Sequence, residues 1–292
     1  ESFVRKNMAY ILILLAAIMW GTLGVFTKNL TSLGFSTVDL LFVRAVVTFL
    51  VAFIAYSIKY SSELKLKKIS DIKYFIGTGI FSYLFFNMCY MNAIIETSMG
   101  VAAILLYTAP AIVMIISVIL FNEKITYKKI IIVAITFGGC CMVTGIGGGN
   151  SVSLKGIILG LCSGLGYALY SIFGKFAIKR GYSSAVITTY TFLFVAIGIL
   201  PFTDVFSLVN HINHEGVWLQ FIFSSILTGA LPYFAYTKGL TSVPASSASV
   251  MASLEPVVAS ILGVVVFSES LSFMKICGIC LVMAGVFASA KN

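Results

Sequence analysis

Charged side chains are scarce in this sequence of 292 residues, because Asp, Glu, Lys and Arg together make up only 10% of it. Ordinary soluble domains carry about 25% charged residues, which they need to cover a surface that faces water. The shortage excludes a soluble globular protein, and it also argues against disordered and disulfide-rich secreted classes. Hydrophobic residues make up 60% of the chain and the mean hydropathy is +1.06, so we expect most of the surface to face lipid.

Side chains that bind metals or catalyse reactions are also rare. The two His residues, His211 and His214, lie in a predicted outer loop, and an H-x-x-H pair without a third ligand is weak evidence for metal. The six Cys residues lie inside apolar runs, including the C-x-x-C pair Cys277 and Cys280. The apolar segments contain no His and no H-E-x-x-H motif. We therefore expect no metal, no cofactor and no enzymatic activity.

Long apolar segments recur along the whole chain. A helix needs about 20 largely apolar residues to cross the hydrocarbon core of a membrane. Runs such as 11–15 and 130–133 do not alternate with polar residues, as the strands of a membrane barrel would. The pattern predicts an all-α polytopic membrane protein with ten transmembrane helices, near residues 10–27, 39–58, 74–94, 101–121, 130–147, 156–174, 184–201, 217–237, 245–267 and 274–290.

The distribution of Lys and Arg predicts the orientation of these spans. Only Lys28, Lys155 and Lys275 fall on the side opposite the N-terminus, Arg44 lies inside a span, and all the other basic residues fall on the N-terminal side. Short cytoplasmic loops are the ones that retain positive charge. We therefore expect both termini in the cytoplasm. The excess of basic residues then indicates contact with membrane lipid and needs no nucleic acid as a partner.

The two halves of the sequence resemble each other. Residues 20–28 align with residues 167–175 at an offset of 147, and at an offset of 146 Pro110 aligns with Pro256 and Glu123 with Glu269. The halves are predicted at 1–147 and 156–292, joined by a linker at 148–155 in a glycine-rich stretch. Each half has five spans, an odd number, so the second half enters the membrane from the other side. Inverted repeats of this kind are typical of transporters.

The chain resembles a known family at these repeated motifs. Tyr107-Thr108-Ala109-Pro110 with Phe121-Asn122-Glu123, and Leu254-Glu255-Pro256 with Phe267-Ser268-Glu269, are similar to the paired EamA repeats of the drug/metabolite transporter superfamily. The resemblance implies ten helices in two inverted five-helix repeats, alternating access, and export of amino acids or other small metabolites. We accordingly expect an integral protein of a bacterial plasma membrane with a small-molecule substrate.

Glu255 is the first candidate for binding the solute. It lies near the centre of the span 245–267, where a carboxylate is expensive unless it is paired, protonated or hydrated. Pro256 removes a backbone donor and loosens the helix at that depth. The hypothesis is a midplane anion that binds a cationic group or a proton, and the alternative is a structural hydrogen bond beside the kink.

Aromatic and polar side chains are predicted at a similar depth. They could stack on a solute, hold an ammonium group over a ring face, or donate hydrogen bonds, although core packing explains many such residues. The candidates for substrate binding are, with Glu255, the residues Trp20, Tyr83, Asn87, Tyr107, Tyr167, Tyr170, Tyr233 and Ser253. The repeat-related pair Tyr90 and Tyr236 falls at opposite ends of its spans, and these two residues are candidate gates.

Several charged or small residues near the span ends suggest other roles. For Arg44 we expect one of three roles: an ion pair with a carboxylate of the protein, a contact with the acid group of a substrate, or extension of its side chain to the lipid head groups. Lys28 and its repeat partner Lys175 are interpreted as interface anchors, and Glu123 and Glu269 as caps or loop contacts. Glycines at 156, 160 and 164 form small-xxx-small spacings that permit close helix approach.

The function that these features favour is a secondary transporter of small metabolites. Amino-acid export by alternating access is the leading hypothesis. A single intramembrane carboxylate, Glu255, is compatible both with proton-coupled transport and with facilitated transport. The alternative is a transporter of organic cations, such as choline-like or polyamine solutes, and a channel is the less favoured third possibility. The sequence does not distinguish among substrates.

The predicted topology can be tested by labelling. We expect impermeant reagents to reach tags at residues 1–7 and at the carboxy terminus from the same, cytoplasmic side of the membrane, because ten spans return the chain to its starting side. Labelling of the two ends from different sides would contradict the ten-span arrangement.

Overall fold

The computed structural model describes residues 2–60, 64–145 and 153–291, and within those ranges its regular secondary structure is entirely helical, without a strand. Ten helical segments in it are long and apolar enough to cross a membrane, and each overlaps one of the ten predicted spans. The all-α, ten-span prediction is therefore confirmed. Residues 148–152 of the predicted linker lie outside the described residues, as do residues 146–147 at the end of the predicted span 130–147.

The first five spans contain eight α-helices and two shorter turns. They are α1 (Ser2–Gly21) with α2 (Leu23–Ser32); α3 (Thr37–Tyr60); η1 (Ile69–Asp71), α4 (Ile72–Ile76), η2 (Gly77–Leu84) and α5 (Phe85–Glu96); α6 (Met99–Leu106) with α7 (Ala109–Phe121); and α8 (Tyr127–Thr144).

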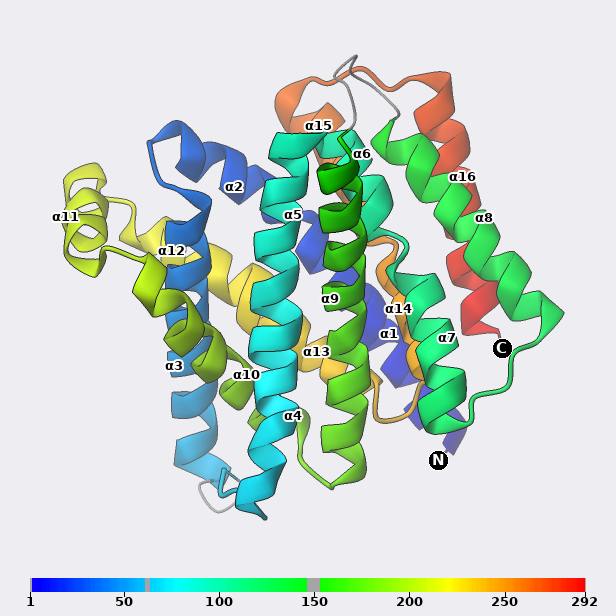
Figure 1. Ribbon diagram of the computed structural model, residues 1–292, viewed down its shortest axis with the longest axis horizontal. Helices are drawn as coiled ribbons and strands as arrows, with labels where there is room; N and C mark the ends of the chain where they lie inside the picture. Colours follow the sequence, from blue (N-terminus) through cyan, green and yellow to red (C-terminus); the bar gives the residue numbers. More distant parts are fainter. Residues whose placement is uncertain (1, 61–63, 146–152, 292) are drawn as a thin grey trace.

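The last five spans contain seven α-helices, and an eighth lies in a connection. They are α9 (Leu154–Lys179); α10 (Ser184–Ile199) with η3 (Leu200–Phe202); α12 (Trp218–Ser225), η4 (Ile226–Ala230) and α13 (Leu231–Gly239); α14 (Ala245–Ala252) with α15 (Glu255–Phe267); and α16 (Phe273–Ala290). Helix α11 (Val205–Glu215) lies between the seventh and eighth spans, at one edge of the molecule (Figure 1).

Helix boundaries recur at the repeat offset. Adding 146 to the bounds of α6, α7 and α8 gives those of α14, α15 and α16. The two residues with a left-handed backbone, Asn122 (φ 54°) and Ser268 (φ 55°), end α7 and α15 at equivalent positions and are the only non-glycine residues of this kind in the described ranges. After each of them a backbone N–H bonds back to the carbonyl six residues earlier, that of Glu123 to Ser117 and that of Glu269 to Gly263, which satisfies a helix-end carbonyl.

Helices α8 and α16 form the main contact between equivalent helices of the two repeats, side by side in Figure 1. A side chain at Gly139 would meet the backbone of Val282 and Gly278 at 2.8 and 2.9 Å, and one at the equivalent Gly285 would meet the hydroxyl of Thr136. Close approach of backbones at small residues is typical of helix packing in lipid. The paired contacts indicate a pseudo-two-fold relation between the repeats.

The glycines predicted to permit close approach on the sixth span do so. A Cβ atom at Gly156, Gly160 or Gly164 would fall 2.3 to 2.6 Å from side-chain atoms of Thr97, Leu105 and Thr108, respectively. The small residues let α9 pack closely against the segment around α6. This contact positions the break between α6 and α7 beside the middle of α9.

The prediction that the two His residues lie in a loop is wrong, because both belong to helix α11. Asp204 caps the helix by accepting from the backbone N–H of Ser207 at 3.0 Å. Leu208 and Ile212, four residues apart, form its buried stripe. His211 stacks on the ring of Phe35, with centroids 4.0 Å apart, and is therefore not a free metal ligand in a solvated loop.

The packing of α8 against α16 predicts the effect of a methyl group there. Gly139→Ala forces the two backbones apart and should destabilise the protein by about 1–3 kcal/mol, because overpacking a close contact costs that much. Gly138→Ala is the matched control, since its added Cβ meets nothing within 4 Å. Thermal unfolding in detergent should show a lower Tm for Gly139→Ala only; equal Tm values would contradict the close contact.

Candidate functional site

The helices of the fourth and ninth spans break at equivalent positions inside the membrane. Helix α14 ends at Ala252 and α15 begins at Glu255, one residue before Pro256, and α6 and α7 are separated at the corresponding place. The interruption predicted from Pro256 is confirmed. Broken helices in transporters bring helix ends and freed backbone groups to the solute site near the midplane.

The third and eighth spans depart from α geometry at equivalent positions too. Both contain π-helical turns, η2 at Gly77–Leu84 and η4 at Ile226–Ala230. Adding the repeat offset of 146 to the last five residues of η2 gives the residues of η4. A π turn shifts the following side chains around the helix and is frequent at functional sites. Here the turns orient Tyr83, at the end of η2, and Tyr233, just after η4.

A cavity of about 20 Å³ lies beside the π turn η2 and helix α13, which directly follows η4. Its wall comes from both repeats, with α1, η2 and α5 on one side and α9 and α13 on the other. This volume is enough for about one water molecule. The residues that line it are Trp20, Ser82, Tyr83, Phe86, Tyr167, Tyr170, Ser171, Tyr233 and Tyr236.

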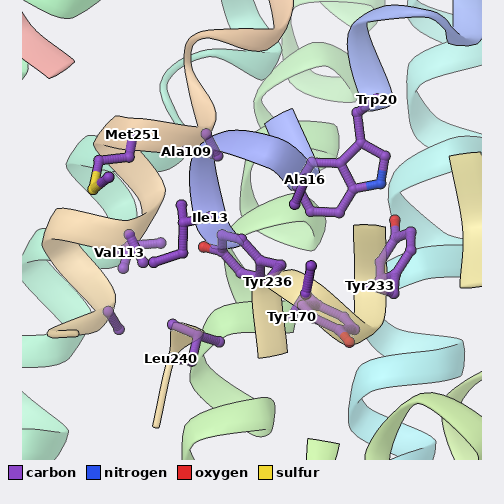
Figure 2. Packing of buried hydrophobic residues seen from close by; sticks show 14 of the residues in the cluster. Ile13, Ala16, Trp20, Ala109, Val113, Tyr170, Tyr233, Tyr236, Leu240 and Met251 are labelled. Carbon is purple, nitrogen blue, oxygen red and sulfur yellow. The ribbon is translucent and has the colours of Figure 1, made fainter. Parts of the chain in front are cut away.

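Aromatic rings form most of the cavity wall, and Figure 2 shows Trp20 beside Tyr233, with Tyr170 and Tyr236 nearby. The centroid of the Tyr233 ring lies 5.0 Å from that of Trp20, 5.4 Å from that of Tyr83 and 5.0 Å from that of Tyr170, in edge-to-face contacts. Such contacts add to the stability from burial. The rings therefore form a stiff, apolar wall with polar groups placed within it.

Hydrogen bonds fix two of these tyrosines against neighbouring helices. The hydroxyl of Tyr170 bonds to that of Thr237 at 2.7 Å, and the hydroxyl of Tyr236 bonds to that of Ser171 at 2.8 Å. Both bonds join α9 to α13. They orient the two rings at the cavity and satisfy hydroxyls that would be costly to bury alone.

Two polar groups of the cavity have no hydrogen-bond partner among the described residues. The indole Nε1 of Trp20 and the hydroxyl of Ser82 are buried without a hydrogen bond to any described residue. Buried polar groups in native proteins are nearly always hydrogen-bonded, so each such exception needs an explanation. An indole nitrogen can only donate. The pair is therefore suited to a bound group that carries an acceptor.

The carboxylate of Glu255 lies beside the cavity and is joined to it by Tyr167. The Tyr167 hydroxyl donates to Oε2 of Glu255 at 3.2 Å, while the Tyr167 ring lines the cavity. Tyr90, Tyr107 and Tyr233 also lie within electrostatic reach of the carboxylate. Glu255 is therefore at the junction of the helix break and the aromatic wall.

Arg44 of α3 approaches the cavity through a different tyrosine. Its Nη1 donates to the hydroxyl of Tyr83 at 3.3 Å, and Tyr83 lines the cavity. Arg44 forms no ion pair with any described residue, so the structural pair with a carboxylate is not present. The side chain points inward to Tyr83 rather than to the lipid head groups.

The remaining predicted site residues do not line the cavity. Asn87 donates its amide to the carbonyl of Tyr83 at 2.8 Å, four residues earlier in the chain. Tyr107 and Ser253 lie at the equivalent helix breaks, Tyr107 at the end of α6 and Ser253 at the end of α14. Of the two candidate gates, Tyr236 lines the cavity and Tyr90 lies near Glu255.

Three residues of the wall are absent from the sequence-based candidates, namely Ser82, Phe86 and Ser171. Ser82 and Ser171 are small hydroxyl residues of a kind common in membrane helices, and the repeat alignment does not mark them, because it pairs them with Thr228 and Gly24. In the described ranges no three His, Cys, Asp or Glu side chains gather as a metal site would require.

Comparisons with known proteins agree with this architecture. The sequence profile of the EamA-like transporter family matches residues 7–145 and again 154–290. An uncharacterised transporter of Archaeoglobus fulgidus is 28% identical over 96% of this chain and 95% of its own length, and the uncharacterised transporter YwfM of Bacillus subtilis is 26% identical over 97% and 94%. One crystal structure shares the fold with a TM-score of 0.76 at 17% identity, covering 97% of this chain and 96% of the other.

The unpartnered Trp20 nitrogen predicts the behaviour of a Phe substitution. Trp20→Phe breaks no hydrogen bond within the protein, but it removes a donor from the cavity, so solute affinity should fall roughly threefold to tenfold. Trp218→Phe is the control, because Trp218 bonds to Asn213 outside the cavity.

The same control supplies the measurement. The chain has only two Trp residues, so the Trp218→Phe protein reports fluorescence from Trp20 alone. Solute binding should change that fluorescence, and its titration gives the affinity of the Trp218→Phe protein. Because Trp20→Phe lacks this reporter, calorimetric titration compares its affinity with that of the wild type. A solute that binds without altering the Trp20 signal, or that binds the Trp20→Phe protein as tightly as the wild type, would contradict a site in this cavity.

Proposed function

The chain belongs to the EamA-like transporter family, and from that membership we propose that it exports amino acids across the plasma membrane by alternating access between its two repeats. It is an integral membrane transporter with ten candidate spans, so the open questions are the solute and the way in which it moves. The outward direction is the one that the family resemblance implies. The solute class rests on the charges around the cavity.

Two oppositely charged side chains, Glu255 and Arg44, support the proposal most strongly, because each is hydrogen-bonded to a tyrosine that lines the cavity. Glu255 bonds to Tyr167 and Arg44 bonds to Tyr83, and both tyrosines line the cavity. Neither charged side chain forms an ion pair with any described residue. An unpaired charge within a membrane is expensive and is usually retained for function.

A zwitterion satisfies both charges at once. The ammonium group of an amino acid would be attracted to Glu255 and to the faces of the aromatic rings. Its carboxylate would be attracted to Arg44, whose guanidinium suits carboxylates, and could accept from Trp20 Nε1. Solutes with a single charge leave one of the two side chains unpaired, so a zwitterion is the better match.

An organic cation is the second candidate, and the aromatic wall favours it. Tyr and Trp rings arranged around a carboxylate resemble the cages that bind quaternary ammonium groups. In that case Glu255 would bind the cationic group of the solute, and Arg44 would only hold Tyr83 in place through their hydrogen bond. The two candidates therefore differ in what they require of Arg44.

The size of the cavity supports a carrier rather than a channel. About 20 Å³ holds a water molecule and is far smaller than an amino acid. A solute of that size enters only when the walls move apart, and such movement is expected of alternating access. Saturable flux with counterflow would distinguish this mechanism from a pore.

The proposal is tested by flux in proteoliposomes with phenylalanine and with phenethylamine, which keeps the ammonium group and lacks the carboxylate. Glu255→Gln should reduce the flux of both solutes at least tenfold, because a charged hydrogen bond contributes about 1.5–3 kcal/mol. Arg44→Gln should reduce phenylalanine flux by a similar factor and leave phenethylamine flux almost unchanged.

Glu215→Gln is the matched control, since Glu215 is a surface residue at the end of α11 and should tolerate the loss of charge. If the protein transports phenethylamine but not phenylalanine, and Arg44→Gln leaves phenethylamine flux unchanged, the organic cation is the favoured solute. Full flux of both solutes in the Glu255→Gln protein would contradict the proposed site.

The same vesicles test proton coupling. Glu255 is the only acidic side chain among the described residues that lies in the middle of a span, because the others lie near span ends or in connections. If it exchanges the solute for a proton, an imposed pH gradient should drive accumulation against the solute gradient. In Glu255→Gln the flux that remains should then not respond to the pH gradient.

A further inference from the structure

On the face that carries the chain termini, the connection between α13 and α14 is held by a lysine. Lys175 of α9 donates from Nζ to the carbonyl oxygens of Leu240 and Val243, at 2.7 and 3.0 Å. Carbonyl groups at a helix C-terminus lack partners within the helix, and a cation there is favourable. The ammonium group of Lys175 therefore fixes the end of α13 and the residues that follow it.

A glutamate from the other repeat holds the far end of the same connection. Glu123, which follows α7, accepts from the backbone N–H of Ala245 at 3.0 Å and from the hydroxyl of Ser246. Ala245 is the first residue of α14, where an anion satisfies free N–H groups. Because Glu123 belongs to the first repeat and α14 to the second, the contact joins the two repeats at this face.

The repeat partners of these two residues lie at the opposite face and make different contacts. Lys28 is equivalent to Lys175, and its counterpart carbonyls would be those of Ile94 and Thr97. Instead, Nζ of Lys28 lies 3.8 Å from the ring centroid of Phe267, at the end of α15. The cation is thus present in both repeats, but only one of the two binds the end of the neighbouring helix.

Glu269, the repeat partner of Glu123, forms no hydrogen bond with the connection at 94–100 in the described structure. Its counterpart contact would be the backbone N–H of Met99, the first residue of α6; the counterpart of Ser246 is Gly100, which has no hydroxyl to donate. Its side chain is 48% exposed, compared with 13% for Glu123. Both glutamates keep the equivalent ion pair, Glu269 with Lys275 at 3.6 Å and Glu123 with Lys129 at 3.8 Å, so the difference between them lies in their contacts with the connection. The start of α6 is capped by Ser98 instead, through the N–H of Val101 at 3.2 Å.

The connection at 94–100 is held by other residues. Glu96 accepts from Nζ of Lys155 at 2.6 Å and from the hydroxyl of Ser153 at 3.2 Å, both at the start of α9. The two equivalent connections, 94–100 and 240–246, therefore differ in their contacts although the sequence supplies the same lysine and glutamate to each. Two independent pairs of residues show the same asymmetry.

We propose that these four residues close the two faces of the transporter in turn. In inverted repeats, each repeat adopts the conformation of the other when access switches sides. The terminal-face lock, formed by Lys175 and Glu123 on residues 240–246, is engaged in this structure. The opposite-face lock, formed by Lys28 and Glu269 on residues 94–100, engages in the alternate state, in which the first lock is released.

This inference rests on the proposed alternating access and adds the residues that stabilise each state. Each lock stabilises only the conformation in which it is formed, so removing one lock shifts the population toward the other conformation. A residue that only stabilises local structure would have no effect at the opposite face. The effect at a distance is therefore the property to measure.

Hydrogen exchange of the purified protein measures both faces together. In Glu123→Gln, amides at 240–246 should exchange about tenfold faster, and amides at 94–100 should exchange more slowly because the opposite-face lock forms more often. Lys175→Met should change both segments in the same directions. Faster exchange at 240–246 with no change at 94–100 would overturn the proposal.

Glu269→Gln keeps the test valid if the Glu123 variant does not fold, because Glu269 is a surface residue. It should lower kcat for transport about tenfold with little change in KM, since the solute site is intact and the alternate state is destabilised. Exchange at 240–246 should become slower. Glu215→Gln, on the same face, should leave kcat and both exchange rates at their wild-type values.

The outcome is separable from that of the proposed function. Wild-type kcat and unchanged exchange in Glu269→Gln would overturn the lock, even where amino-acid flux still depends on Glu255 and Arg44. Conversely, reciprocal exchange in the Glu123 variant would support the lock even where the transported solute is an organic cation.

Discussion

The need to satisfy backbone hydrogen bonds in a lipid environment constrains the whole structure. Irregular backbone is tolerated at membrane depth only where protein or a cavity surrounds it. The helix breaks of the fourth and ninth spans and the π turns of the third and eighth obey this constraint. Their repetition in both halves indicates that the irregularities are built into the fold rather than accidental. The cavity is lined by η2 and by α13, which directly follows η4.

Tyrosine is the residue through which this fold joins polar chemistry to an apolar interior. Tyr167 links the aromatic wall to Glu255, and Tyr83 links it to Arg44. Each ring packs as a hydrophobic side chain, and each hydroxyl carries one hydrogen bond to a charged group. The charges can therefore influence the cavity while their own side chains lie outside its wall.

Hydropathy and the repeat determined most of what could be predicted. Ten spans, the paired motifs and the helix interruption at Pro256 all follow from composition and spacing, because lipid imposes length and polarity on every span. The facing of side chains did not follow. The π turns at Gly77–Leu84 and Ile226–Ala230 shift the rotation of the residues beyond them, so Ser82 escaped notice while Asn87, expected at the site, bonds to its own helix. Helix α11 was missed because hydropathy windows detect spans and not short surface helices.

The most direct test of the account is a structure of the transporter with phenylalanine bound. The account predicts that the solute lies among Trp20, Tyr170 and Tyr233 in a widened cavity, with its ammonium group toward Glu255 and its carboxylate toward Arg44. A solute bound outside this cavity, or bound within it with no approach to either charged side chain, would contradict the account.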